Sequence, residues 1–117
     1  MPNEEVDLVE GIAGMLDFLN AEATGGIRGE TIGRYEENNI IIDTCWTNDC
    51  QWYETAVKDP RYHDSFIIVG QYGRDRAAAE VGHNKYVIAL TAAQPPPELT
   101  NIRQFGLPER SFPLKPQ

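Results

Sequence analysis

Residues that commonly carry out catalysis are scarce in this sequence of 117 residues. It contains two cysteines, two histidines and two serines, and neither serine lies in the Gly-x-Ser-x-Gly pattern of a nucleophile elbow. The glycines also lack the spacing of a phosphate-binding loop or of a dinucleotide-binding fingerprint. We therefore expect no enzymatic activity, no cofactor and no bound metal.

Basic residues and long apolar runs are scarce as well. Ten Lys and Arg residues stand against 18 Asp and Glu residues, for a formal net charge of −8, which argues against direct nucleic-acid binding and against an anionic membrane surface. No apolar run approaches the roughly 18 residues of a membrane-spanning helix. Residues 1–23 contain six acids and no base, unlike a signal peptide, so we expect a cytoplasmic protein.

Helical periodicity over residues 3–23 predicts an acidic N-terminal helix, which we assign to residues 1–24. Its apolar residues recur three and four positions apart on one face. A second side presents two glycines and an aromatic ring, which form either a groove for another helix or a partly buried phenylalanine between two weak points of the helix. These three candidate partner-binding residues are Gly11, Gly14 and Phe18.

Residues 25–93 predict the core of an α+β fold. Four segments with strand patterns, joined by short turns, indicate a four-stranded antiparallel meander, and Asn38-Asn39 suits the positive φ angles of a tight hairpin turn. Helical periodicity then predicts one helix packed on the sheet, from about residue 74 to residue 92. Small residues such as Gly82 in its apolar arc would allow close packing on the sheet. One flank of this arc consists of Ala77, Val81 and Ile88.

Residues 94–117 hold six of the eight prolines and predict an extended C-terminal arm. Three consecutive prolines prevent a helix and favour an extended chain. Disordered tails are normally poor in large apolar groups, whereas this segment carries one every few residues. We therefore expect the arm to lie along a surface, either of a neighbouring subunit or of its own domain. Its candidate partner-binding residues are Leu99, Ile102, Phe105, Leu107, Phe112 and Leu114.

The two cysteines admit a metal-site interpretation and a simpler one. Cys45 and Cys50 flank a turn and would face each other across two strands. With His63 they imitate three ligands of a zinc finger, but the fourth ligand is missing at the required spacing. We expect a reduced pair of thiols, as is usual in the cytoplasm.

The remaining candidates for chemistry also have structural interpretations. Asp43 and Glu54 fall on adjacent predicted strands, where two carboxylates can form a hydrolytic pair, but solvated strand positions explain them more simply. His83 lies at the border of the apolar arc of the second helix, and we expect a packed, hydrogen-bonded imidazole there. The neighbours His63, Asp64 and Ser65 point in different directions on an extended chain, unlike a catalytic triad.

The segments WYETAV, IIVGQY and RAAAEVGHNKYV resemble a family of short proteins encoded by tailed phages and prophages. The matching positions lie within residues 52–90 and include a Tyr-Glu-Thr strand, a strand that ends in tyrosine, and a helix with Gly-His. These positions are Tyr53, Glu54, Thr55, Tyr72, Ala78, Gly82, His83, Tyr86 and Val87. The family has no assigned enzymatic activity and is often encoded near head and tail assembly genes.

The resemblance implies a non-enzymatic structural or accessory protein of virion assembly, made in the host cytoplasm and then present in the virion. Such a homo-oligomeric protein would bind other protein subunits, here through the C-terminal arm and the N-terminal helix. The alternative is a small acidic phage protein that counters a host defence by sequestering a protein or a nucleotide.

Overall fold

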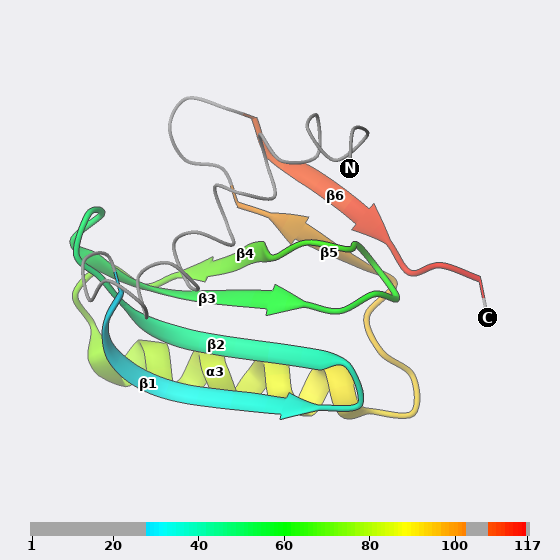
Figure 1. Cartoon of the computed structure of the whole chain (residues 1–117), viewed down its shortest axis with the longest axis horizontal. Coiled ribbons are helices and arrows are strands. Elements are labelled where there is room, and N and C mark those ends of the chain that lie inside the picture. The colour runs from blue at the N-terminus through cyan, green and yellow to red at the C-terminus, as the bar shows by residue number, and fades with distance from the viewer. Residues whose placement is uncertain (1–27, 103–107, 117) are drawn as a thin grey trace.

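The computed structural model describes residues 28–102 and 108–116, which contain one helix and two antiparallel sheets (Figure 1). Four strands form the first sheet in the order β1-β2-β3-β4. These strands are β1 (Arg28–Glu37), β2 (Ile40–Thr47), β3 (Trp52–Lys58) and β4 (Ile67–Gln71). The helix α3 (Arg76–Thr91) follows, and β5 (Glu98–Asn101) then pairs with β6 (Arg110–Pro113) in the second sheet.

The predicted fold class, an α+β fold with an N-terminal helix and an extended proline-rich C-terminal arm, is wrong. The described chain is a mostly-sheet fold, in which the proline-rich segment supplies a two-stranded sheet with Leu99 paired to Phe112. Prolines are compatible with this arrangement because those of the described segment lie outside the two strands or at the last residue of β6, where no central ladder bond is lost. The predicted N-terminal helix lies outside the described residues. The coarser prediction, that the chain combines a helix with an antiparallel sheet, agrees with the structure.

The turn between β1 and β2 lies at the predicted pair of asparagines. Asn38 and Asn39 have φ angles of 54° and 67°, the left-handed conformation that a two-residue hairpin turn requires at both positions. Glu37 pairs with Ile40 directly across this turn. The turn therefore sets the register of β1 from Gly33 to Glu37, and the register shifts on either side of Thr31 change the pairing towards the start of the strand.

The helix α3 covers one face of the four-stranded sheet (Figure 1). Its first turn is capped by Asp75, whose carboxylate accepts a hydrogen bond from the Ala78 N–H at 3.0 Å. Its buried residues are Ala79, Gly82, His83 and Leu90. The described residues include no helix with the length and apolar character of a membrane span.

One flank of the apolar arc does not pack as predicted. Val81 and Ile88 are 69% and 70% exposed, and Ala77 is exposed as well. The predicted apolar arc is wider than the part of the helix surface that one sheet covers, so this flank lies away from the sheet.

The main core joins the two sheets and α3. It contains Ile40, Ile42, Val57, Tyr62, Ile67, Val69, Leu90, Leu99 and Phe112. Two of these side chains come from β5 and β6, so the second sheet contributes to the same core as the first. A smaller cluster lies on the other face of the four-stranded sheet, because strand side chains alternate between faces. This cluster contains Cys45, Ala56, Phe66 and Ile68.

The loop between β3 and β4 forms hydrogen bonds both to the end of α3 and to the C-terminal segment. The buried carboxylate of Asp59 accepts hydrogen bonds from the Arg61 guanidinium, the shortest at 2.8 Å. That guanidinium also donates to the Leu90 carbonyl oxygen at 2.8 Å, and the Arg61 carbonyl oxygen accepts from the Lys115 N–H at 2.8 Å. We name these contacts the Arg61 junction.

Candidate functional site

A chain of hydrogen bonds crosses the interface between α3 and the sheet. His83 Nδ1 lies 2.8 Å from Thr44 Oγ1, which lies 2.7 Å from Thr55 Oγ1. Thr55 Oγ1 in turn lies 2.9 Å from the Tyr72 hydroxyl. The two threonines are direct partners in the register of β2 and β3. The prediction of a packed, hydrogen-bonded His83 is therefore confirmed, and the buried hydroxyl groups satisfy one another.

Three glycines make room for the rings at the two ends of this chain. The His83 imidazole lies over Gly33 of β1, where a Cβ atom would be 2.6 Å from the ring. Tyr72 lies between Gly70 of β4 and Gly82 of α3, and a Cβ atom at either glycine would overlap its hydroxyl group. Gly82 thus makes space for one particular side chain.

Burial favours the uncharged forms of the two rings through the pKa of each. Burial lowers the pKa of His83 from its ordinary value of 6.5, and the negative charge of Asp43 opposes this effect. Burial also raises the pKa of Tyr72 above its ordinary value, against a smaller opposite effect of its hydrogen bond to Thr55. A neutral imidazole and neutral hydroxyls bonded to one another stabilise a packed interface.

Asp43 and Glu54 are buried, and the prediction of solvated positions is wrong. Asp43 is 0% exposed and accepts hydrogen bonds from Arg28 at 2.7 Å and Arg34 at 3.1 Å. Glu54 is 1% exposed and accepts one from Trp52 Nε1 at 2.8 Å. Strand alternation fixes the face of a side chain but not its exposure. Here two arginines from the neighbouring strand cover the Asp43 carboxylate and supply the charge that its burial requires.

The two cysteines do not face each other. Thr47 pairs with Trp52, so Cys45 pairs with Glu54 and Cys50 lies in the turn between β2 and β3. The prediction placed the centre of this turn too early in the chain. Within the part of the chain that the structure describes, no three His, Cys, Asp or Glu side chains gather as metal ligands.

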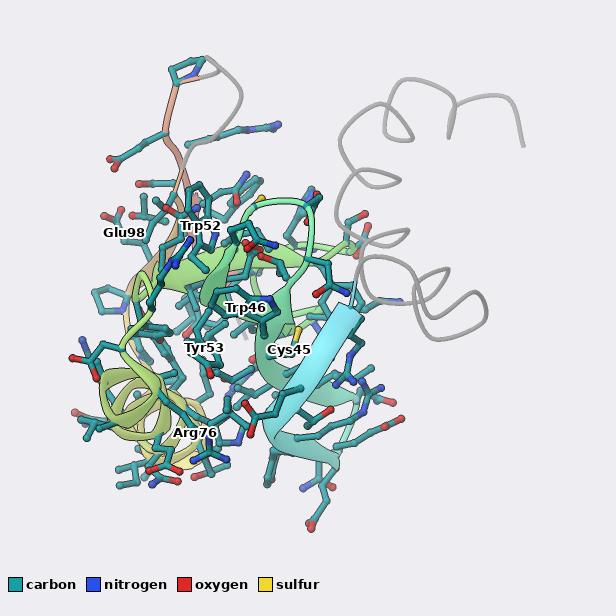
Figure 2. The ribbon with its side chains drawn as sticks, turned by 90° about the vertical axis from the view of Figure 1, so that its left-hand side faces the viewer. Cys45, Trp46, Trp52, Tyr53, Arg76 and Glu98 are labelled. Atoms are coloured by element: carbon teal, nitrogen blue, oxygen red, sulfur yellow. The ribbon has the colours of Figure 1, made fainter. Side chains whose placement is uncertain are left out.

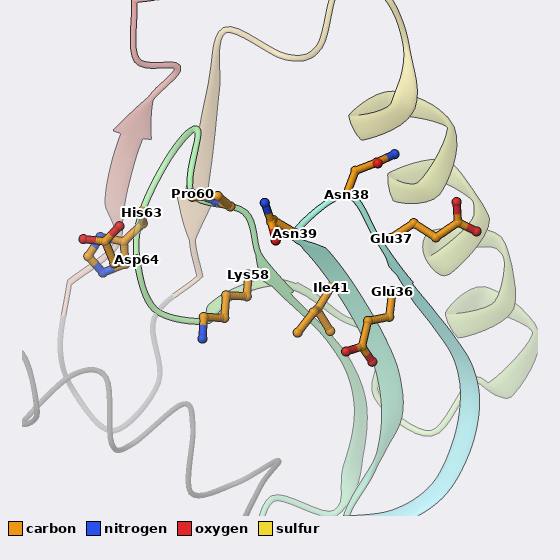
Figure 3. Close-up of a pocket in the computed structure, with 9 residues that line it drawn as sticks. All are labelled: Glu36, Glu37, Asn38, Asn39, Ile41, Lys58, Pro60, His63 and Asp64. Atoms are coloured by element: carbon orange, nitrogen blue, oxygen red, sulfur yellow. The ribbon is translucent and has the colours of Figure 1, made fainter.

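An open pocket lies between the β1–β2 turn and the β3–β4 loop (Figure 3). Its volume is about 510 Å³, and it is lined by Glu36, Glu37, Asn38, Asn39, Ile41, Lys58, Pro60, His63 and Asp64. The lining carries charges of both signs and one large aliphatic side chain. This combination favours no single class of ligand, so we assign none to the pocket.

Aromatic and charged side chains meet where α3 begins beside β1 (Figure 2). The Trp46 and Tyr53 rings pack edge to face with centroids 5.0 Å apart. The Tyr53 hydroxyl donates to Glu30 at 3.1 Å, and Glu30 also pairs with Arg76 at 2.9 Å. These two hydrogen bonds, that of Arg76 first, lower the pKa of Glu30. Arg76 also pairs with Glu80 within α3. Because Glu30 belongs to β1, its ion pair with Arg76 attaches the start of α3 to that strand.

The structure separates the predicted partner-binding residues into three groups. Leu99 and Phe112 are 4% and 7% exposed and lie in the main core, so the arm packs on its own domain at these two positions. Ile102 and Leu114 are half-buried. Outside the described residues, and therefore still predictions, are Gly11, Gly14, Phe18, Phe105 and Leu107.

Large exposed hydrophobic side chains lie instead on the outward face of α3, which we define as Ala77, Val81, Asn84, Ile88 and Thr91. Val81 and Ile88 are seven residues apart and therefore lie on the same side, two turns from each other. The sequence contained a signal for this surface: the apolar arc of α3 is broader than a helix with a single buried face needs. The outward face of α3 is the candidate functional site.

No family model matches this sequence, and neither the curated proteins nor the solved structures contain a match.

Proposed function

We propose that this chain is a non-enzymatic assembly protein that binds other protein subunits through the outward face of α3. The observation that carries the proposal is the exposure of Val81 and Ile88, 69% and 70%, on one side of a capped helix. Isolated exposed hydrophobics are ordinary, whereas aligned ones on a regular element form the kind of surface that partners bury.

The predicted contact through the C-terminal arm is changed by this proposal. Leu99 and Phe112 belong to the main core, so we move the proposed contact from the arm to α3. The assembly role in a phage particle remains the expectation that the resemblance implies, and it motivates a search for partners among other polypeptides of the same particle.

Crosslinking of the full chain inside the cells that make it tests the proposal. We expect crosslinked species larger than the 13.1 kDa monomer, and we expect Val81→Glu with Ile88→Glu to remove them. Gln94→Glu is the matched control, because it adds a negative charge at an exposed position beyond the helix. Crosslinks that persist unchanged in the double variant would refute the proposal, provided that circular dichroism shows all chains equally folded.

A further inference from the structure

The outward face of α3 has the spacing of a two-stranded coiled-coil seam. Its five residues follow one another at intervals of four, three, four and three, which is the pattern of a and d positions in a heptad repeat. All five are exposed. At about 100° per residue they lie opposite the buried residues of the helix. The face that could join another helix is therefore separate from the face that binds the sheet.

The seam is flanked by one acidic and one basic side chain. Glu80 precedes Val81 on one side, and Lys85 follows Asn84 on the other. These are the g and e positions, whose charges choose the partner and the orientation of coiled coils. In a parallel pair, Glu80 of each helix lies beside Lys85 of the other, so two attractive contacts form by symmetry. In an antiparallel pair centred on Asn84, like charges would meet.

The seam residues themselves also suit two parallel copies. The a positions, Val81 and Ile88, are β-branched, the residue type that parallel dimers prefer at these positions. Asn84 lies at the d position between them and would meet its own copy across the two-fold axis, so in-register pairing keeps the two polar side chains together at some cost in stability. In a parallel two-stranded coiled coil the a and d residues lie beside their own copies across the two-fold axis, so the apolar side chains meet in matched pairs.

Both flanking charges are accessible for such contacts. The Glu80 side chain pairs within its own helix with Arg76 and is 51% exposed. The Lys85 ammonium lies 5.4 Å from the centroid of the Tyr86 ring and is on the exposed side of the helix. Exposed contacts of this kind are weak, about 1 kcal/mol or less. A neighbouring helix with a complementary charge can therefore compete with them.

The length of α3 limits the strength of the pairing. Sixteen residues rise about 24 Å, which is short for a coiled coil. The surface that two helices of this length can bury is small compared with the roughly 1,600 Å² of a standard interface. Pairing of isolated copies should be weak, and attachment of several copies to one assembly would raise its occupancy through effective concentration.

We infer that two copies of this chain pair in parallel through the outward face of α3, with Glu80 of one copy beside Lys85 of the other. The inference rests on the proposed function and names its partner as a second copy. Because a two-fold axis parallel to the helices relates the copies, each pairing uses both charge contacts at once.

Sedimentation equilibrium of the purified full chain, from about 10 μM to about 1 mM at low salt, tests the pairing. We expect a monomer–dimer equilibrium that either Glu80→Lys or Lys85→Glu weakens, by roughly tenfold for two reversed contacts. The double variant E80K/K85E should return to within about threefold of the original chain, because opposite charges meet again. A chain that stays monomeric, or a dimer that the single reversals leave unchanged, would overturn the inference.

The orientation is tested by an Ala77→Cys variant under mild oxidation. Because Cys50 is a partly exposed thiol, the test uses a Cys50→Ser background. A parallel pair brings the two introduced thiols together, so non-reducing gels should show a covalent dimer that Cys50→Ser alone does not form. In an antiparallel pair these thiols would be separated by most of the helix, and the absence of that band in a dimeric sample would overturn the parallel arrangement.

The two proposals fail in different ways. If the purified chain is monomeric while its crosslinks in cells still depend on Val81 and Ile88, the pairing is wrong and the proposed contact surface stands. If neither self-association nor crosslinking depends on these residues, both proposals are wrong.

Discussion

Gly82 lies inside a helix, where alanine would be more favourable, because a Cβ atom at this position would overlap the Tyr72 hydroxyl. We expect Gly82→Ala to lower the free energy of unfolding by about 1–2 kcal/mol. Overpacking costs about 1–3 kcal/mol, and the better helix propensity of alanine offsets at most about 1 kcal/mol of it. Urea denaturation measures the change.

Asn84→Ala is the matched control on the same helix, because Asn84 is exposed and alanine favours the helix. At low protein concentration, where the chain is monomeric, it should leave stability unchanged or raise it by a few tenths of a kcal/mol. If Gly82→Ala behaves like Asn84→Ala, the close contact between Gly82 and Tyr72 does not constrain the fold.

His83 should make stability depend on pH in the mildly acidic range. Its pKa in the folded chain is lowered from 6.5 by burial, so between the two values the unfolded chain binds more protons than the folded chain. The stabilisation is therefore complete above about pH 6.5, decreases as pH falls towards the folded pKa, and levels off below it.

Urea midpoints of the original chain and of His83→Gln, measured between about pH 5 and pH 8, isolate this contribution, because the carboxylates titrate in both chains. The variant should show a flatter profile. Equal slopes in the two chains would mean that His83 has the same pKa folded and unfolded.

Among the elements, the β1–β2 hairpin depends on two residues with positive φ. Asn39 has φ 67°, so Asn39→Gly should raise the free energy of unfolding by about 0.5 kcal/mol by relieving residual strain. Asn39→Val should lower it by about 1–2 kcal/mol, because a β-branched residue is strained in this conformation. Thermal unfolding of the three chains gives the order, and a valine variant as stable as the original would contradict the turn geometry.

The predictability of each element depends on whether its signal is local. The Asn38-Asn39 turn and the cap-to-end extent of α3 follow from neighbouring residues, and both were predicted. The pairing of β5 with β6 connects positions separated by about eight intervening residues, with no tight-turn signal between them, and three prolines before β5 suggested an extended arm.

The candidate site was visible in the sequence only in part. The composition of the apolar arc placed Ala77, Val81 and Ile88 on one flank, but their exposure depends on how far the sheet extends around the helix. The burial of Asp43 likewise depends on arginines of another strand. Such outcomes belong to tertiary structure and have no local signal.

For the whole molecule, the second sheet is part of the fold. Leu99→Ala should lower the free energy of unfolding by about 2–4 kcal/mol, because the side chain is 4% exposed in the main core and its truncation leaves a cavity. Val81→Ala, a truncation at an exposed position, should change it by less than about 0.5 kcal/mol. Chemical denaturation at low protein concentration compares the two.

Equal effects of the two truncations would show that Leu99 is not a core residue. Because Leu99 belongs to the main core, deletion of residues 95–117 would also remove core side chains. A deletion of that kind would measure folding together with any partner contact, so substitutions on α3 are the cleaner test of assembly.

The Arg61 junction has a kinetic consequence for the far end of the chain. Because one side chain bonds the Leu90 carbonyl and its backbone bonds the Lys115 N–H, the last turn of α3 and the C-terminal segment should open as one cooperative unit. Deuterium exchange should then report similar protection for these amides. Arg61→Ala should speed the exchange of both groups while the amides of the β1–β2 hairpin keep their rates, and acceleration of only one group would show that the two segments open independently.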